Sequence, residues 1–145
     1  MSPRYQAAVA TVSGMRRLLV GVLVVTLVGC GERDTYSHDD VVTALTDNGV
    51  QVQDAGSAPG DPFSVDARKL AANGHELRVY EYADTSSRER DSSTILADGW
   101  SVNGTQVEWI GAPHFWIRGR VIVLYLGSDA EAIAMITAAM GTPSF

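Results

Sequence analysis

Residues that could take part in chemistry gather between Glu108 and Trp116. If this part of the chain forms strands, side chains alternate between two faces, and His114, Trp116 and Arg118 share one of them. Glu108 would then lie on the preceding strand, across from His114. A histidine–glutamate pair can act as acid and base in a hydrolase, and tryptophans can supply a binding surface. We therefore take Glu108, Trp109, His114 and Trp116 as the candidate binding residues.

These residues also have a simpler explanation. Aromatic and charged side chains on the solvent-facing side of a sheet cover one another through ordinary cross-strand pairing, without any ligand. A hydrolase that uses His114 with Glu108 is the alternative to a binding role. It requires the two side chains within hydrogen-bonding distance in a concave pocket, whereas a flat, open face would count against it.

The run His38-Asp39-Asp40 resembles a set of metal ligands only at first sight. Side chains adjacent in sequence at the start of a helix diverge, and no further His or Cys is placed to complete a coordination set. Ser37 can cap a helix there, and acidic residues in the first turn are favoured by the helix dipole. Capping therefore explains this run, and we expect no metal.

Nucleophilic catalysis and cofactor binding have no support in the sequence. No Gly-x-Ser-x-Gly motif occurs, and no Gly-rich loop that could bind phosphate follows a predicted strand. Four serines lie in one polar segment without a histidine in local register; they are Ser86, Ser87, Ser92 and Ser93. We expect neither a catalytic residue nor a cofactor.

Cys30 is the only cysteine of the chain, and it follows directly on an apolar segment. Arg16 and Arg17 precede this segment, which covers the 11 uncharged residues 18–28. Such a length is typical of the hydrophobic region of a signal peptide and is well below the ~20 residues that span a bilayer. Cys30 has no disulfide partner within the chain, and the sequence turns polar directly after it.

The residues Leu27-Val28-Gly29-Cys30 resemble the lipobox of bacterial lipoprotein signal peptides. The resemblance implies cleavage between Gly29 and Cys30, a thioether link from the sulfur to diacylglycerol, and often a further acyl chain on the freed amine. Each buried CH₂ of these chains contributes about 0.8 kcal/mol, so two or three chains anchor a protein stably. A plain secretory signal with an incidental cysteine, or an internal apolar strand, is the alternative.

This interpretation divides the chain into four parts. Residues 1–14 fit poorly before the arginine pair, and we expect translation to start at Met15. Residues 15–29 would be the signal peptide, 30–36 a lipidated tether, and 37–145 a single globular domain. Gly31 after the cysteine, by resemblance to lipoprotein sorting signals, favours the outer membrane if the cell has two membranes.

Charge limits the partners of the processed chain. Cleavage before Cys30 leaves 116 residues with eight Lys or Arg against seventeen Asp or Glu, a net charge of −9. An acidic surface argues against nucleic acid and against a basic face lying on anionic lipid. The expected partners are the membrane, through the lipid on Cys30, and an envelope protein or a small ligand.

Hydrophobic periodicity predicts three helices and six strands. The helices cover residues 39–48, 86–97 with Ser86 as cap, and a segment that starts after Ser128, its expected cap, and ends before Gly141. The strands cover residues 50–53, 63–70, 76–83, 105–110, 114–117 and 120–126. Asn73-Gly74 predicts a hairpin turn, and residues 121–126, apolar on both faces, predict a central strand. We expect an α+β fold whose mostly antiparallel sheet of about five to six strands carries helices mainly on one face.

Three segments of the mature domain resemble uncharacterised small exported bacterial proteins. They are Val79-Tyr80-Glu81-Tyr82, Trp109 with Pro113-His114-Phe115, and the strand Ile122 to Tyr125. The resemblance implies an independently folding exported module and brings no activity. We therefore expect a membrane-anchored extracytoplasmic lipoprotein that serves as a non-catalytic binding or accessory module. The alternatives are the hydrolase described above and a purely structural envelope lipoprotein.

Overall fold

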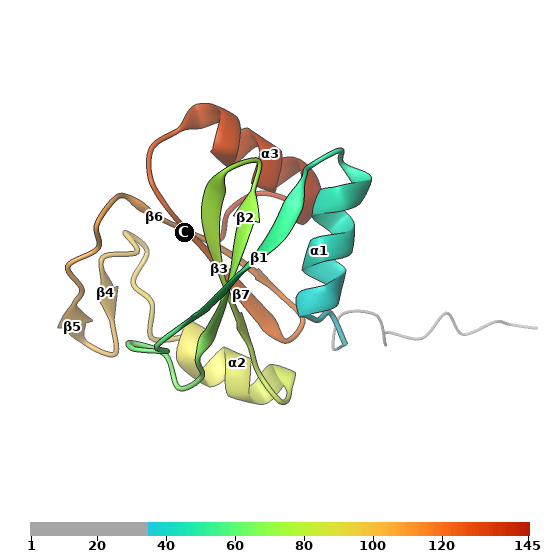
Figure 1. Ribbon diagram of the computed structural model, residues 1–145. Coiled ribbons are helices and arrows are strands. Elements are labelled where there is room, and N and C mark those ends of the chain that lie inside the picture. Colours follow the sequence, from blue (N-terminus) through green and yellow to red (C-terminus); the bar gives the residue numbers. More distant parts are fainter. Residues whose placement is uncertain (1–34) are drawn as a thin grey trace, which may run out of the picture.

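Five antiparallel strands form the sheet around which the described part of the chain is arranged (Figure 1). The computed structural model describes residues 35–145, so the predicted signal peptide, the lipobox and Cys30 lie outside the described residues. The strands lie in the order β1 (Val52–Ala58), β2 (Ala67–Ala72), β3 (His75–Glu81), β7 (Val121–Leu126) and β6 (Pro113–Arg118). A separate small hairpin consists of β4 (Ser101–Val102) and β5 (Thr105–Gln106).

The apolar strand β7 lies inside the sheet, as its sequence predicts. It pairs with β3 on one side and with β6 on the other. Residues 121–125 are buried on both faces of the sheet. Full burial of a large apolar side chain stabilises a fold by about 1.5–3 kcal/mol, which explains why this strand does not alternate with polar residues.

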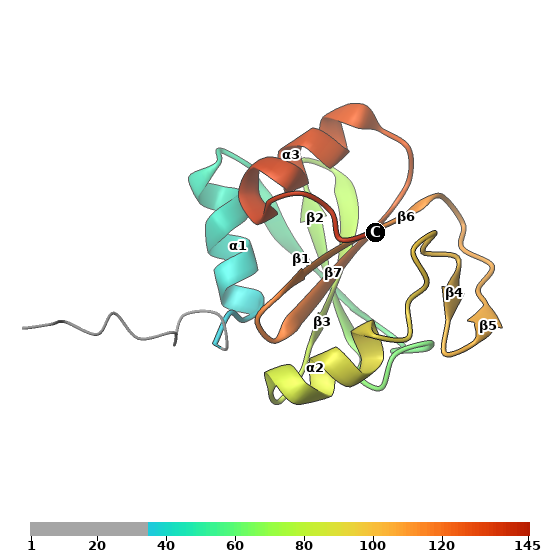
Figure 2. The same cartoon turned by 180° about the vertical axis from the view of Figure 1, so that it is seen from behind.

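Two of the three described helices cover one face of the sheet (Figure 2). They are α1 (His38–Asp47) and α3 (Ala130–Met140), which pack with Leu70, Leu77 and Trp116 in one hydrophobic core. On the opposite face lie α2 (Thr85–Ser92) and the segment 93–109, and there Tyr80, Phe115 and their neighbours form a second core. The α+β class and the antiparallel sheet are therefore confirmed.

The helix caps follow the prediction at α1 and differ from it at the other two helices. Ser37 and Asp40 form a reciprocal capping box at α1. The cap of α2 is Asp84 rather than Ser86, and the cap of α3 is Asp129 rather than Ser128. A carboxylate both accepts hydrogen bonds from the first amides and is favoured by the helix dipole, which explains why aspartate takes this position.

Several predicted boundaries are wrong. α2 ends at Ser92 rather than at residue 97, because its polar residues offer no apolar face and the chain turns to bury Ile95. β1 continues to Ala58 through a bulge around Gly56, where the sequence predicts a loop. The predicted strand 63–70 begins only at Ala67, because residues 61–65 form a turn that directs Phe63 into the second core. The predicted strand 105–110 is reduced to the two residues of β5.

Tyr36, predicted to belong to the tether, is part of the domain. Its side chain is buried, its hydroxyl donates to Met140 Sδ at 3.3 Å, and its carbonyl accepts from Arg120 N–H at 3.0 Å. The Arg118 guanidinium lies 4.3 Å from the centre of its ring. An aromatic ring with this many partners is more stable in the core than in solvent, so Tyr36 belongs to the folded domain. Within residues 35–145, no helix has the length and apolar character that crossing a membrane requires.

Candidate functional site

Trp116, a predicted binding residue, is buried in the core beneath α1 and α3. Only 1% of its surface is exposed. The alternation that places His114, Trp116 and Arg118 on one face of β6 is confirmed, but this is the face that the helices cover. The prediction that Trp116 lines an exposed binding face is therefore wrong.

His114 lies half-buried at the edge of the same core. Its ring stacks on Tyr125 with 6.3 Å between the ring centres and 22° between the planes, and it lies 6.3 Å from the Trp116 ring. The contact with Tyr125 follows from strand register, since these two residues are paired across β6 and β7. Cross-strand pairing accounts for this arrangement without a ligand.

Trp109 and Glu108 lie apart from His114 and Trp116. The Trp109 indole N–H donates to the Gly99 carbonyl at 2.9 Å, and its ring meets Phe115 edge-on in the second core. Glu108 is exposed and lines a cavity of about 330 Å³ next to Asp61. Because β5 ends at Gln106, residues 107–112 are not paired with β6, and Glu108 does not come opposite His114. The four predicted residues do not form one site.

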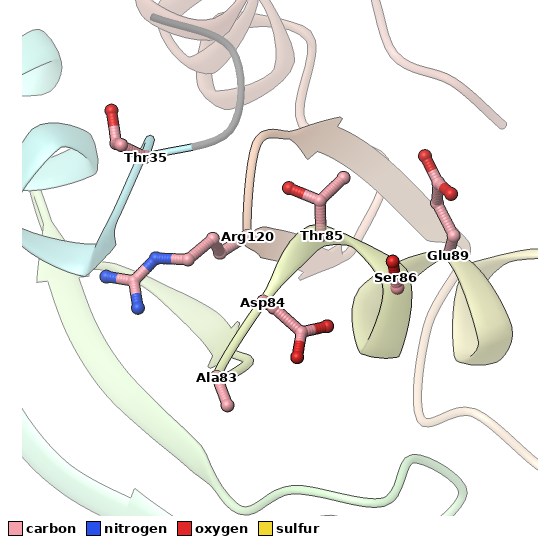
Figure 3. A pocket seen from close by; sticks show the side chains of 7 residues that line it. All are labelled: Thr35, Ala83, Asp84, Thr85, Ser86, Glu89 and Arg120. Atoms are coloured by element: carbon pink, nitrogen blue, oxygen red, sulfur yellow. The ribbon is translucent and has the colours of Figure 1, made fainter. Parts of the chain in front are cut away.

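A larger cavity, of about 670 Å³, opens where the described chain begins (Figure 3). Three segments line it: Thr35, the first part of α2 with the two residues before it, and the start of β7. The lining residues are Thr35, Ala83, Asp84, Thr85, Ser86, Glu89 and Arg120. Thr35 and the Arg120 guanidinium lie on one side of the cavity, and Glu89 lies on the other. We refer to it as the Arg120 cavity.

Strand pairing explains why these residues meet. Glu81, at the end of β3, pairs with Val121, at the start of β7. The Tyr82 N–H then donates to the Arg120 carbonyl at 2.9 Å, which holds the chain leading into α2 against the start of β7. The backbone contact between Arg120 and Tyr36 brings Thr35 to the same place.

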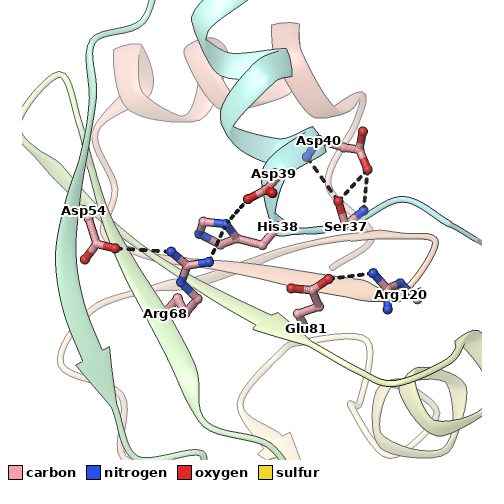
Figure 4. Close-up of polar contacts among 8 residues, drawn as sticks. All are labelled: Ser37, His38, Asp39, Asp40, Asp54, Arg68, Glu81 and Arg120. Atoms are coloured by element: carbon pink, nitrogen blue, oxygen red, sulfur yellow. Dashed lines mark hydrogen bonds and ion pairs between the residues drawn. The ribbon is translucent and has the colours of Figure 1, made fainter.

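Arg120 is the one cation among the residues that line this cavity. Its Nη2 donates to Glu81 Oε1 at 2.8 Å, and its Nη1 donates to the Tyr82 carbonyl at 3.4 Å. The side chains of Arg120 and Glu81 are 30% and 31% exposed, so solvent screens the pair and its stabilising effect is small. The guanidinium is nevertheless held in position at the cavity wall (Figure 4).

Two carboxylates share the Arg120 cavity with this guanidinium. The Ser87 N–H donates to Asp84 Oδ1 at 2.7 Å and holds the pKa of Asp84 below its usual range, so Asp84 is ionised near neutral pH. Glu89 is exposed and lies 3.7 Å from Arg88. The hydroxyls of Thr35, Thr85 and Ser86 complete the lining. Such a lining can hydrogen-bond a polar ligand but offers no activated nucleophile.

The run His38-Asp39-Asp40 joins α1 to the sheet (Figure 4). His38 is buried, and its Nδ1 lies 3.1 Å from Arg68 Nη1. The same nitrogen lies 3.3 Å from Asp39 Oδ1, so the His38 ring lies between Arg68 of β2 and the first turn of α1. Arg68 also contacts Asp54 of β1 at 3.3 Å. Across residues 35–145, no group of three or more His, Cys, Asp or Glu side chains is arranged to hold a metal ion.

The sequence analysis did not identify Arg120 or Asp84 as site residues. Arg120 reaches Glu81 across 39 positions of the chain, so no local pattern marks this pair. The N-cap role of Asp84 could have been predicted, because an aspartate directly before a polar helical segment is a common N-cap. No family model matches the chain, and neither a curated protein nor a solved structure is detectably similar to it.

Proposed function

We propose that this chain is a lipid-anchored extracytoplasmic protein whose domain is a non-catalytic binding module. The observation that carries the proposal is the position of Cys30: it follows an apolar segment of signal-peptide length and precedes the first described residue of the domain by five positions. A cysteine there, without a disulfide partner, has the chemistry that acylation requires.

The positions and the hydrogen-bond partners of the polar groups favour binding over catalysis. The two groups that a hydrolase would need, Glu108 and His114, belong to different surroundings. In the Arg120 cavity, Asp84 caps α2 and Arg120 pairs with Glu81. Fixed charges of this kind orient a ligand, and a general acid or base would need freedom to exchange its proton. We therefore assign the binding role to the Arg120 cavity.

The ligand that suits this cavity is small and polar. One guanidinium, two carboxylates and the hydroxyls of Thr35 and Ser86 offer both donors and acceptors, which a sugar or an amino acid could use together. A multiply charged anion is disfavoured, because Asp84 and Glu89 would repel it.

Acyl labelling tests the anchor. Cells that express the protein are grown with an alkyne-tagged fatty acid, and the purified protein is analysed by intact mass and by peptide mapping. We expect the label on Cys30 and a chain that begins at this residue, and no label in the Cys30→Ser variant. An unlabelled wild-type protein that keeps residues 15–29 would refute the anchor.

A ligand screen tests the binding role. We expect that titration of the detergent-solubilised protein with monosaccharides and amino acids shifts the amide resonances of residues 83–89 and 120. The shifts should disappear in Arg120→Gln and persist in Arg90→Gln, which changes an exposed arginine outside the cavity. If no compound shifts these resonances, the structural envelope lipoprotein becomes the better interpretation.

A further inference from the structure

The chain between the proposed anchor and the domain is short. Five residue steps separate Cys30 from Thr35. A fully extended chain advances at most about 3.6 Å per residue, so these steps span no more than about 18 Å in any conformation. Whatever path residues 31–34 take, Thr35 lies close to the membrane that holds the lipid.

The connection could become longer only if Thr35 and Tyr36 detached from the domain and lost their native contacts. Tyr36 is fixed by its hydrogen bonds to Met140 and Arg120 and by the Arg118 guanidinium above its ring. Thr35 itself lines two adjoining cavities, one with Arg120 and one with Asp40 and Arg118. The position of Thr35 relative to the sheet is therefore defined.

One end of the domain surrounds Thr35. It consists of Thr35, the turn between β6 and β7 at residues 118–120, and the first turn of α2; we call it the Thr35 end (Figure 3). The opposite end carries the β2–β3 turn at Asn73-Gly74 and Gln51, whose N–H donates to Asn73. The seven residues of β3 run from one end to the other, a distance of about 20 Å at the usual rise per strand residue.

We infer that, in the anchored protein of the proposed function, the Thr35 end faces the lipid head groups and the β2–β3 turn points away from the membrane. This inference rests on the proposed acylation of Cys30. It assigns a membrane-facing surface to the domain, and it means that a ligand reaches the Arg120 cavity from the head-group side.

The chemistry of the Thr35 end suits contact with head groups and not insertion among acyl chains. Arg118 is exposed there and can donate to a lipid phosphate, as can the hydroxyls of Thr35 and Ser86. In the described part of the chain, the exposed large hydrophobic residues are Leu96, Trp100 and Ile110, none of which lines the two cavities at this end. The acidic residues of the domain offset the arginines, so the tether and not charge determines the orientation.

Fluorophore labelling in liposomes tests the orientation. Because Cys30 carries lipid, a second cysteine is the only free thiol, and bimane is attached at Ser86→Cys or Arg118→Cys at the Thr35 end. Gln51→Cys and Glu131→Cys, also exposed, serve as the distant pair. The acylated proteins, processed to begin at Cys30, are reconstituted with phosphatidylcholine that carries a nitroxide on its head group.

We expect strong quenching at the first pair and little at the second, since the ends lie about 20 Å apart. Insertion of fifteen Gly/Ser residues after Asp34 should abolish the difference, because a long flexible linker releases the domain from the surface. Equal quenching at all four positions, or stronger quenching at Gln51 and Glu131, would overturn the inference while leaving the anchor intact.

Intact mass of the same samples separates this failure from that of the proposed function. If Cys30 carries acyl chains and the protein floats with the liposomes, the quenching result concerns the orientation alone. If Cys30 is unmodified, both the proposed anchor and the orientation that depends on it are refuted.

Discussion

A single carboxylate oxygen of Asp91 joins three parts of the chain. Asp91 Oδ2 accepts from the Ser64 N–H at 2.7 Å, from the Ser64 hydroxyl at 2.7 Å and from the Tyr82 hydroxyl at 2.9 Å. Asp91 and Tyr82 are both buried. Burial, and then the hydrogen bond to this carboxylate, raise the pKa of Tyr82, so the hydroxyl stays a donor. This network attaches α2 to the end of β3.

Tyr82→Phe should weaken the fold without changing its shape, because it removes only the hydroxyl. A hydrogen bond to a charged group contributes about 1.5–3 kcal/mol, and we expect the free energy of unfolding to fall by that amount in urea titrations. Ser57→Ala, on the exposed part of β1, should change it by less than about 0.5 kcal/mol. Equal stability of Tyr82→Phe and the wild type would show that this hydrogen bond is absent.

Substitution of Trp116 should destabilise the fold more than substitution of Trp109, although the sequence places both residues in one candidate site. Trp116→Ala leaves a large cavity beneath α1 and α3 and should cost about 3–5 kcal/mol of unfolding free energy. Trp109→Ala should cost less, since Trp109 is only half-buried. Urea titrations of the two variants measure this difference, and a larger loss at Trp109 would contradict the placement of Trp116 in the core.

At the level of the helices, each of the three described helices has an aspartate hydrogen-bonded at its N-terminus, as the N-cap in α2 and α3 and in the first turn of α1. Asp40 is held by the Ser37 hydroxyl, Asp84 by the Ser87 amide, and Asp129 by the amides of Ala132 and Glu131. These hydrogen bonds lower the pKa of all three carboxyls. Each helix therefore depends on an ionised group at its first turn.

Low pH should destabilise the N-termini of all three described helices. Because the folded pKa values lie below the usual aspartate pKa of about 3.9, the stabilisation is present above that pH and is lost as the pH falls through the folded values. We expect the urea midpoint to decline below about pH 4. Asp129→Asn keeps an acceptor without a titrating group and should show a shallower decline; an unchanged decline would contradict the role of Asp129.

At the level of the whole molecule, the charge of the chain does not favour binding to an anionic membrane. Residues 31–145 carry eight basic against seventeen acidic side chains. The hydrophobic cores on both faces of the sheet are closed by helices or by the segment 93–109. Among residues 35–145 the exposed large hydrophobic side chains are Leu96, Trp100 and Ile110, and the excess of acidic residues disfavours binding to anionic lipid.

Residues 31–145, expressed without the preceding segment, should stay in the supernatant when phosphatidylglycerol vesicles are sedimented at low ionic strength. Repulsion between the acidic domain and the anionic lipid is the reason. The acylated protein that begins at Cys30, as the matched control, should sediment with the vesicles. Sedimentation of the unanchored domain that decreases with added salt would contradict this effect of charge.

Features that depend on neighbouring residues were readable from the amino-acid order alone. The hairpin at Asn73-Gly74, the N-cap at Ser37 and the burial of β7 each follow from backbone preferences or from the apolar pattern of a few consecutive residues. The proposed anchor at Cys30 is likewise a local pattern, and it stays a prediction that the labelling experiment tests.

The site depends on pairing between distant strands. The face of β6 that holds Trp116 became core only because α1 and α3 both pack on it, and the Arg120 cavity exists only because β3 pairs with β7. Alternation along a strand predicts which residues share a face, but not which of the two faces the helices will cover. That choice is made by burial summed over the whole domain, which is why it required the three-dimensional fold.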